Sequence, residues 1–346
     1  MTSPSRVTIL DIDSIKPIPM ITKALFTLIL LSPALQAADD NKKSTWIDPQ
    51  KASQEDPDFS YQGEYYKKGS DYGVQVVALG GGKFDAYILE GGLPGLGWEK
   101  GKERIKLSGE LSKNGVQFDS GKKWDIAITG DTLALNLYKK AAHALKRIER
   151  KSPTLGAQPP EGATVLFDGS GVEHWENGQM KGGLLQATGT TSKPKFKDYK
   201  LHLEFRTPYK PFARGQGRGN SGVYFGGRWE TQVLDSFALD GKMNECGGIY
   251  SISEPDVNMC LPPLTWQTYD VDFTAAKFDD RGNRTAWPHM TVKLNGVLIH
   301  DKRELNKDNT TAAPGKGPLK DEALPVYLQN HGNPVFFRNI WVLPKK

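Results

Sequence analysis

One short segment of the 346-residue sequence carries two carboxyl groups and an amide close together, and carboxyl groups are among the groups that general acid–base chemistry uses. It reads WETQVLDS over 229–236 and contains Glu230, Gln232 and Asp235. On a regular strand Glu230 and Gln232 share one face, whereas Asp235 points away unless a bulge changes the register. Glu230 and Asp235 are therefore candidate catalytic carboxyl groups, and Gln232 is a candidate substrate ligand. The alternative is that these acids decorate a solvent-exposed face.

Other polar and aromatic residues supply the remaining groups that a reaction on a polar substrate needs. His331 follows a predicted strand within the segment QNHG and could transfer a proton near neutral pH. Asn220 precedes another strand, and its amide can donate to and accept from a sugar hydroxyl. Turn formation, surface ion pairs and core packing are the ordinary alternatives for residues of these types. The further candidate substrate-binding residues are Arg206, Trp229, Tyr250, Asn258 and Asn330.

Charge and motif content exclude several classes of partner. The 45 Lys and Arg are scattered among 40 Asp and Glu, giving a net charge of +5, so nothing indicates a nucleic-acid partner. No HExxH motif, EF-hand loop or closely spaced histidine pair is present in the sequence. We therefore expect no cofactor, and a structural or catalytic divalent ion has no support from the sequence.

The N-terminal region resembles a secretory signal peptide. An apolar run, ALFTLILL over 24–31, follows Lys23 and precedes small residues around Ala37. The run is too short to span a bilayer. We expect removal of residues 1–37, with Met20 as an alternative start, and a secreted or periplasmic product without a membrane partner. A buried strand or a membrane anchor is the alternative.

The sequence contains two cysteines, Cys246 and Cys260. In an oxidising compartment they could form a disulfide that closes a loop of about 15 residues. Two free, buried thiols are the alternative.

Alternating apolar and polar residues predict an all-β protein. Residues 38–62 are expected to be a linker, and 63–150 a small, mostly β domain that ends in one helix over 134–149. After a Pro-rich boundary, strand follows strand over 161–346, which is typical of a two-sheet β-sandwich or jelly roll. The pair Asn295-Gly296 predicts a tight hairpin, because both turn positions need a positive φ.

Several motifs along 161–344 occur together in order. They include VLFDGSGVEHW (165–175), GNSGVYF (219–225), WETQVLDS (229–236) and LQNHGNPVFFRNI (328–340). Together they resemble the 3-keto-disaccharide hydrolase domain family. The resemblance implies a concanavalin-like sandwich that acts on disaccharides or glycosides already oxidised at C3 of the sugar. Residues 63 to about 109 resemble a domain often found ahead of this one, with no function attached.

A ketone at C3 makes the chemistry accessible to ordinary side chains. It acidifies the C2 hydrogen and makes the C1 substituent a β leaving group, so a base, an acid and hydrogen-bond donors suffice. Elimination followed by addition of water is then hydrolysis overall, and the saccharide or glycoside is the expected partner.

Two other functions stay open. The strand around Glu230 is similar to the E-x-D-x-x-E strand of laminarinase-like glycosidases, but Gln232 and Asp235 depart from that pattern. A carbohydrate-binding module without catalysis would share the same fold.

Overall fold

The computed structural model describes residues 44–119, 124–137 and 142–345. The predicted signal peptide lies outside these residues. Within them, no helix combines the length and the apolarity that crossing a bilayer requires.

Two short helices occupy part of the segment predicted to be a linker. They are α2 (Pro49–Glu55) and α3 (Asp58–Tyr61). Asp48 caps α2 by accepting a hydrogen bond from Lys51 N at 3.0 Å, and proline at the first helical position suits a helix start. The buried Asp58 accepts from Gly82 N at 2.8 Å, so α3 is attached to the sheet that follows.

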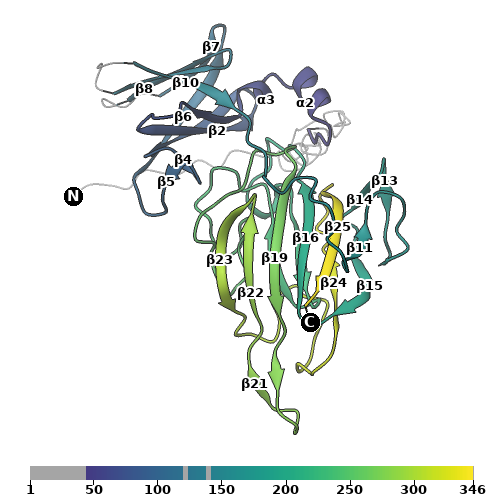
Figure 1. Cartoon of the computed structure of the whole chain (residues 1–346). Helices are drawn as coiled ribbons and strands as arrows, with labels where there is room; N and C mark the ends of the chain where they lie inside the picture. Colours follow the sequence, from purple (N-terminus) through teal and green to yellow (C-terminus); the bar gives the residue numbers. More distant parts are fainter. Residues whose placement is uncertain (1–43, 120–123, 138–141, 346) are drawn as a thin grey trace, which may run out of the picture. The chain divides into compact units, whose positions relative to one another are not determined.

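The first group of strands closes into an antiparallel barrel (Figure 1). Its interior is apolar and contains Val74, Phe84, Ile126 and Leu135, each almost completely buried. The barrel order is β1 (Gly63–Tyr66), β10 (Ala142–Ile148), β9 (Thr132–Leu137), β8 (Trp124–Thr129), β7 (Gly115–Phe118), β6 (Arg104–Ser112), β3 (Lys83–Glu90) and β2 (Tyr72–Gly80), with the small pair β4 (Leu93–Pro94) and β5 (Gly97–Trp98) beside it.

The predicted helix over 134–149 is wrong, because the structure forms strands β9 and β10 in this region. Leu133 and Leu135 are buried two positions apart on β9, and Leu145 is buried on β10. Apolar residues at these positions satisfy both a helical and an alternating pattern. Pairing with β8 and β1 closes the barrel, and this tertiary contact decides between the two.

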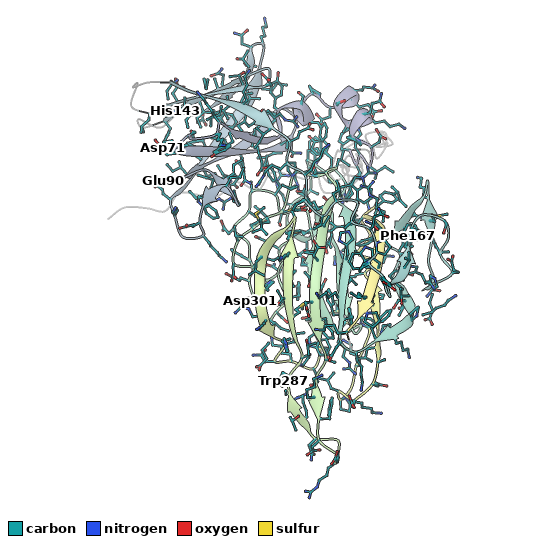
Figure 2. All side chains as sticks on the ribbon, viewed as in Figure 1. Asp71, Glu90, His143, Phe167, Trp287 and Asp301 are labelled. Atoms are coloured by element: carbon teal, nitrogen blue, oxygen red, sulfur yellow. The ribbon has the colours of Figure 1, made fainter. Side chains whose placement is uncertain are left out.

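The second group of strands forms a two-sheet β-sandwich, which confirms the predicted all-β class. Side chains fill the space between the sheets (Figure 2), among them Leu203, Phe225 and Phe273. The large sheet has the order β13 (Met180–Lys181), β14 (Leu184–Gln186), β25 (Phe336–Pro344), β16 (Tyr199–Arg206), β19 (Gln267–Thr274), β22 (His289–Leu294) and β23 (Val297–Glu304), with β11 (Thr164–Phe167) also on β25; the small sheet has the order β12 (Trp175–Glu176), β15 (Thr190–Phe196), β24 (Leu324–Leu328), β17 (Ser221–Phe225) and β18 (Trp229–Val233).

Two hairpins extend the large sheet. The predicted turn between β22 and β23 is confirmed, since Asn295 has φ 53° and Gly296 has φ 80°. A further hairpin, β20 (Lys277–Phe278) with β21 (Arg284–Ala286), projects between β19 and β22. Trp287, which directly follows β21, is labelled in Figure 2, and the Arg284 guanidinium stacks over its ring.

The chain that follows the barrel covers part of the outer face of the large sheet. Gly156 N donates to Glu204 Oε1 at 2.6 Å, and Thr154 Oγ1 donates to Asp270 Oδ2 at 2.6 Å. His202 Nδ1 lies 2.6 Å from Asp270 Oδ1 beneath this segment. His202 and Glu204 of β16 are therefore buried beneath residues 152–157.

Candidate active site

The strands β24, β17 and β18 of the small sheet present a polar face on the side away from the core. Val223 of β17 packs into the core, so Gly222 and Tyr224 face the other way. The register pairs Gly222 with Gln232 and Tyr224 with Glu230 across β17 and β18. Glu230 and Gln232 therefore share one face, as the strand pattern predicts.

Glu230 is the buried carboxyl group at the centre of this face. A Cβ atom on Gly222 would lie 2.2 Å from Glu230 Oε1, so the carboxyl group covers the glycine. Glu230 is 2% exposed, and this loss of hydration raises its pKa to about 7 against a lowering by the hydrogen bond with Tyr224. Near neutral pH the group can both hold and release a proton, as a general base or acid must.

Tyr224 is oriented toward Glu230 by a hydrogen bond on its far side. Its hydroxyl oxygen accepts from Gln329 Nε2 at 2.8 Å, which leaves the hydroxyl proton for Glu230. Burial and the neighbouring carboxyl group raise the pKa of Tyr224, so it stays a neutral donor. The ring of Tyr327 packs edge-on against it, with centroids 5.4 Å apart.

Three buried amide groups surround Gly222. The oxygens of Asn220, Gln232 and Gln329 have no hydrogen-bond partner among the described residues. Asn220 Nδ2 and Gln232 Nε2 donate to Gln216 Oε1 at 2.9 and 3.0 Å, and the nitrogen of Gln329 is held as described above. Because each nitrogen end is anchored, each oxygen is a fixed acceptor. Leaving such acceptors unpaired costs about 1–3 kcal/mol each, which a ligand with hydroxyl donors would offset.

Asp235 is engaged elsewhere. Its Oδ2 lies 2.6 Å from Arg218 Nε, and both residues are buried. The guanidinium also reaches the carbonyl oxygens of Ala78 and Pro211 at 3.3 and 3.4 Å. These contacts hold the buried Arg218 guanidinium in place.

Comparison with known proteins places this sandwich in a family. A family model described as a 3-keto-alpha-glucoside-1,2-lyase-like domain matches residues 162–343, more than half of the chain. The chain belongs to this family. The resemblance noted from the motifs is thereby confirmed, and we call residues 162–343 the lyase-like domain.

The lyase-like domain also has similar solved structures. A protein from Parabacteroides distasonis described as a "putative glycosyl hydrolase" is 32% identical, with a TM-score of 0.49, over 54% of this chain and 85% of that chain. A second from that organism, with the same description, is 18% identical, with a TM-score of 0.40, over 54% of this chain and 95% of that one. None of the curated proteins matches the chain.

Of three further predicted residues in the lyase-like domain, one is hydrogen-bonded to the backbone of Glu230 and two follow Gln329 in the chain. Tyr250 N donates to Glu230 O at 3.0 Å, and the Tyr250 side chain is half-buried. Asn330 and His331 directly follow Gln329 and are exposed. Asn330 Oδ1 accepts from Gly332 N at 2.9 Å and shapes this loop.

Three other predicted ligands make contacts within the protein. Trp229 packs in the core, where its indole nitrogen donates to the carbonyl oxygen of Lys307 at 2.7 Å. Arg206 belongs to the large sheet and stacks over Trp266, 4.8 Å from the ring centroid. Asn258 donates to two loop carbonyl groups and accepts from Cys260 N, so its amide is fully used.

The predicted disulfide is absent. Cys246 and Cys260 are free thiols and are 0% and 2% exposed. The Cys246 sulfur lies 3.5 Å from the Tyr269 hydroxyl, and Cys260 donates to the carbonyl oxygen of Leu234 at 3.4 Å. Of the two alternatives, the structure contains the pair of buried thiols.

The sequence reasoning missed Tyr224, Gln329 and Gln216. Tyr224 stands two positions after Gly222, and a glycine that alternates with polar or aromatic residues on a strand indicates that another group approaches closely there. Gln329 was part of a quoted motif but was passed over in favour of His331. Gln216 precedes the strand in a Gly-rich loop and gives no signal of its own.

No group of three or more His, Cys, Asp and Glu in the described part of the chain is arranged to hold a metal ion. The polar groups that surround Glu230 are amides and tyrosine hydroxyls. These groups suit the recognition of hydroxyl-bearing molecules.

Proposed function

We propose that the lyase-like domain cleaves the glycosidic bond of 3-keto disaccharides or glycosides, with Glu230 as the base that removes the C2 proton. One observation carries the proposal: Glu230 is a buried carboxyl group with a pKa raised to about 7, set among fixed hydrogen-bonding groups. A base with a pKa near the working pH combines a useful ionised fraction with useful basicity.

The proposed step balances in protons and electrons. The Glu230 carboxylate takes the C2 proton, and the electron pair of that C–H bond forms an enolate with the C3 ketone. The enolate then re-forms the ketone while the C1–O bond breaks, which leaves a double bond between C1 and C2. The leaving oxygen takes a proton from an acid, and water can later add at C1, so the sum is hydrolysis. His331 is our candidate for that acid because it is exposed beside Gln329.

The unpaired amide oxygens support a saccharide as the substrate. Asn220, Gln232 and Gln329 each offer an acceptor that the protein leaves without a partner among the described residues. Sugar ring hydroxyls are donors of the matching kind. Tyr224 keeps its proton directed toward Glu230, which favours the return of Glu230 to a defined orientation after each turnover.

The direct test uses a 3-keto glucoside in heavy water. We expect release of the aglycone and uptake of deuterium at C2 of unreacted substrate or product. Glu230→Gln removes the base and should lower both by about 10²-fold or more. Glu176→Gln, an exposed glutamate on the same sheet, is the matched control and should retain both. Unchanged turnover in Glu230→Gln would remove Glu230 from the mechanism.

The two other functions make different predictions. A binding module would retain its affinity for saccharides in Glu230→Gln and would show no turnover to lose. A laminarinase-type glycosidase would cleave an unoxidised β-glucan and needs two carboxyl groups about 5–5.5 Å apart. The partner that faces Glu230 across β17 and β18 is Tyr224, which supports the elimination chemistry.

A further inference from the structure

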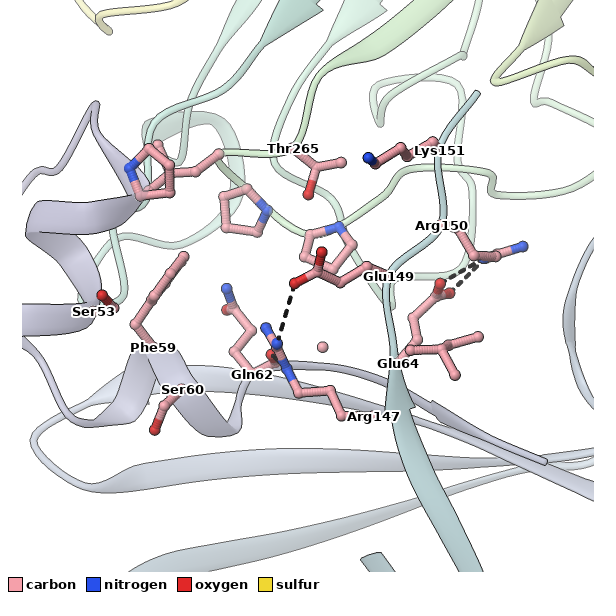
Figure 3. A pocket seen from close by; sticks show the side chains of 16 residues that line it. Ser53, Phe59, Ser60, Gln62, Glu64, Arg147, Glu149, Arg150, Lys151 and Thr265 are labelled. Carbon is pink, nitrogen blue, oxygen red and sulfur yellow. Dashed lines mark hydrogen bonds and ion pairs between the residues drawn. The ribbon is translucent and has the colours of Figure 1, made fainter. Parts of the chain in front are cut away.

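A cavity is lined by residues that take no part in the Glu230 face. It has a volume of about 470 Å³ and is formed by α2, α3, the start of β1, the end of β10 and the loop Pro262–Thr265 (Figure 3). This volume is in the range of small-molecule binding sites, about 300–1,000 Å³. The elements that form it contain none of the groups assigned to the proposed reaction.

One wall of this cavity is apolar and rigid. Phe59 of α3 contributes its ring, and Pro262 and Pro263 contribute theirs from the loop. Leu264 N donates to the carbonyl oxygen of Thr207 at 3.0 Å, and the Leu264 side chain packs with the barrel core. The loop is therefore fixed in place, and this wall suits a flat or ring-shaped apolar group.

The opposite wall is charged, and part of that charge is neutralised internally. Arg150 donates to both oxygens of Glu64 at 2.5 and 2.6 Å, so this pair carries no net charge. Arg147 lies 3.6 Å from Glu149, whose carboxyl group is largely exposed. Lys151 is exposed and has no ion pair within the described ranges. The lining therefore has one positive charge in excess.

Gln62 adds a hydrogen-bond donor that opens onto the cavity. It is 1% exposed, and its Oε1 accepts from Ala78 N at 3.3 Å and from Arg218 Nη2 at 3.5 Å. These donors fix the amide so that Nε2 faces the other way, and no described residue accepts from it. Figure 3 shows the nitrogen end of Gln62 directed into the cavity beside Phe59. This N–H is open to the cavity, so an acceptor group of a ligand that enters the cavity can take the place of water there.

We propose that this cavity binds a small organic anion with an apolar ring body. The ring packs against Phe59 and the prolines, while the anionic group accepts from Gln62 Nε2 and lies near Arg147 and Lys151. Hydrogen bonds to an ionised acceptor are about twice as strong as those between neutral groups. We therefore expect the anionic group to contribute to the affinity alongside the apolar ring. This site is independent of the reaction proposed for Glu230.

The test compares two probes that differ by one group. 8-Anilinonaphthalene-1-sulfonate has an aromatic body and a sulfonate, and N-phenyl-1-naphthylamine has the same body without it. Binding of each to the full chain is measured by fluorescence titration. The variant Gln62→Glu is isosteric and keeps the acceptor for Ala78 N but replaces the donor by a negative oxygen. Lys151→Gln removes an exposed charge, and Lys146→Gln, an exposed lysine that does not line the cavity, is its control.

We expect the sulfonate probe to bind more tightly than the neutral probe. Gln62→Glu should weaken the binding of the sulfonate probe by about tenfold or more, and Lys151→Gln should weaken it by about two- to fivefold. Lys146→Gln should leave its affinity unchanged, and the neutral probe should respond to none of the three variants. Equal affinity for both probes, or sulfonate binding that Gln62→Glu and Lys151→Gln leave unchanged, would overturn the proposal.

Discussion

The carboxyl group of Glu230 occupies the space that a side chain on Gly222 would need. A Cβ at position 222 would stand 2.2 Å from Glu230 Oε1 and 2.9 Å from its carboxyl carbon. The glycine therefore has a defined purpose on β17: it lets a carboxyl group from β18 lie flat across the strand, among the amides of Asn220, Gln232 and Gln329.

The first prediction follows from this contact. Gly222→Ala should push the Glu230 side chain away from its position and lower kcat/KM on a 3-keto glucoside by about tenfold or more. Gly217→Ala is the control, because a Cβ there meets nothing within 4 Å. Circular dichroism should show both variants folded. Equal activity of the two variants would show that the position of Glu230 over Gly222 does not matter.

The second prediction concerns the pH dependence of activity. Burial raises the pKa of Glu230 to about 7, and the base form is the ionised one. The rate should therefore rise as the pH increases through about 7 and level off above it. A profile of kcat/KM between pH 5 and 9 measures this. A rise centred near pH 4.5 would mean that Glu230 is not the titrating base.

The third prediction concerns stability. Between pH 4.5, the ordinary pKa, and about pH 7, the folded protein keeps a proton on Glu230 that the unfolded chain releases. The contribution of this group to stability is thus present at low pH and is lost as the pH rises through that window. Glu230→Gln lacks this titration. Its free energy of unfolding, relative to that of the native chain, should therefore rise by up to about 3 kcal/mol as the pH increases from about 4.5 to about 7.5. Urea unfolding at several pH values measures the difference, and a constant difference would contradict it.

The fourth prediction separates Asp235 from the chemistry. Asp235→Asn leaves the Arg218 guanidinium buried without its counter-charge, which should cost about 3–5 kcal/mol of stability. At a temperature where the variant is folded, kcat should change little. Thermal unfolding and steady-state kinetics measure the two effects, and a large loss of kcat in folded protein would return Asp235 to the catalytic groups.

The fifth prediction concerns the thiols. Cys246 and Cys260 are buried and free, so a thiol reagent should label neither in the native protein and both after denaturation without reductant. Labelling is counted by absorbance or mass. If denatured, unreduced protein gave no labelling, a disulfide would be present.

The sequence was sufficient for the elements with a clear two-residue period. Leu201, Leu203 and Phe205 alternate with polar residues, as is typical of a strand with one buried face, and they lie in the core. Asn295-Gly296 forms the predicted hairpin. The strand over 142–148 was mistaken for part of a helix, because its apolar spacing fits both patterns and only pairing with β1 and β9 resolves it.

The candidate site was predicted in part, for a related reason. Glu230 and Gln232 could be placed together because they belong to one strand. Tyr224 belongs to β17 and Gln329 directly follows β24, and their contact depends on a register that the chain does not encode locally. Trp229 was predicted to bind substrate because it lies next to Glu230 in sequence, but its side chain is on the opposite face of the strand and packs in the core.

The segment 152–157 has a practical consequence for anyone dividing this chain. The family match begins at residue 162, yet Gly156 and Thr154 supply hydrogen bonds to Glu204 and Asp270 on the outer face of the large sheet. A fragment that begins at residue 162 lacks this segment. It would expose the carboxyl group of Glu204 and the imidazole of His202 to water. A fragment that starts near Lys151 keeps this cover. The folded unit therefore begins about ten residues before the first residue of the family match.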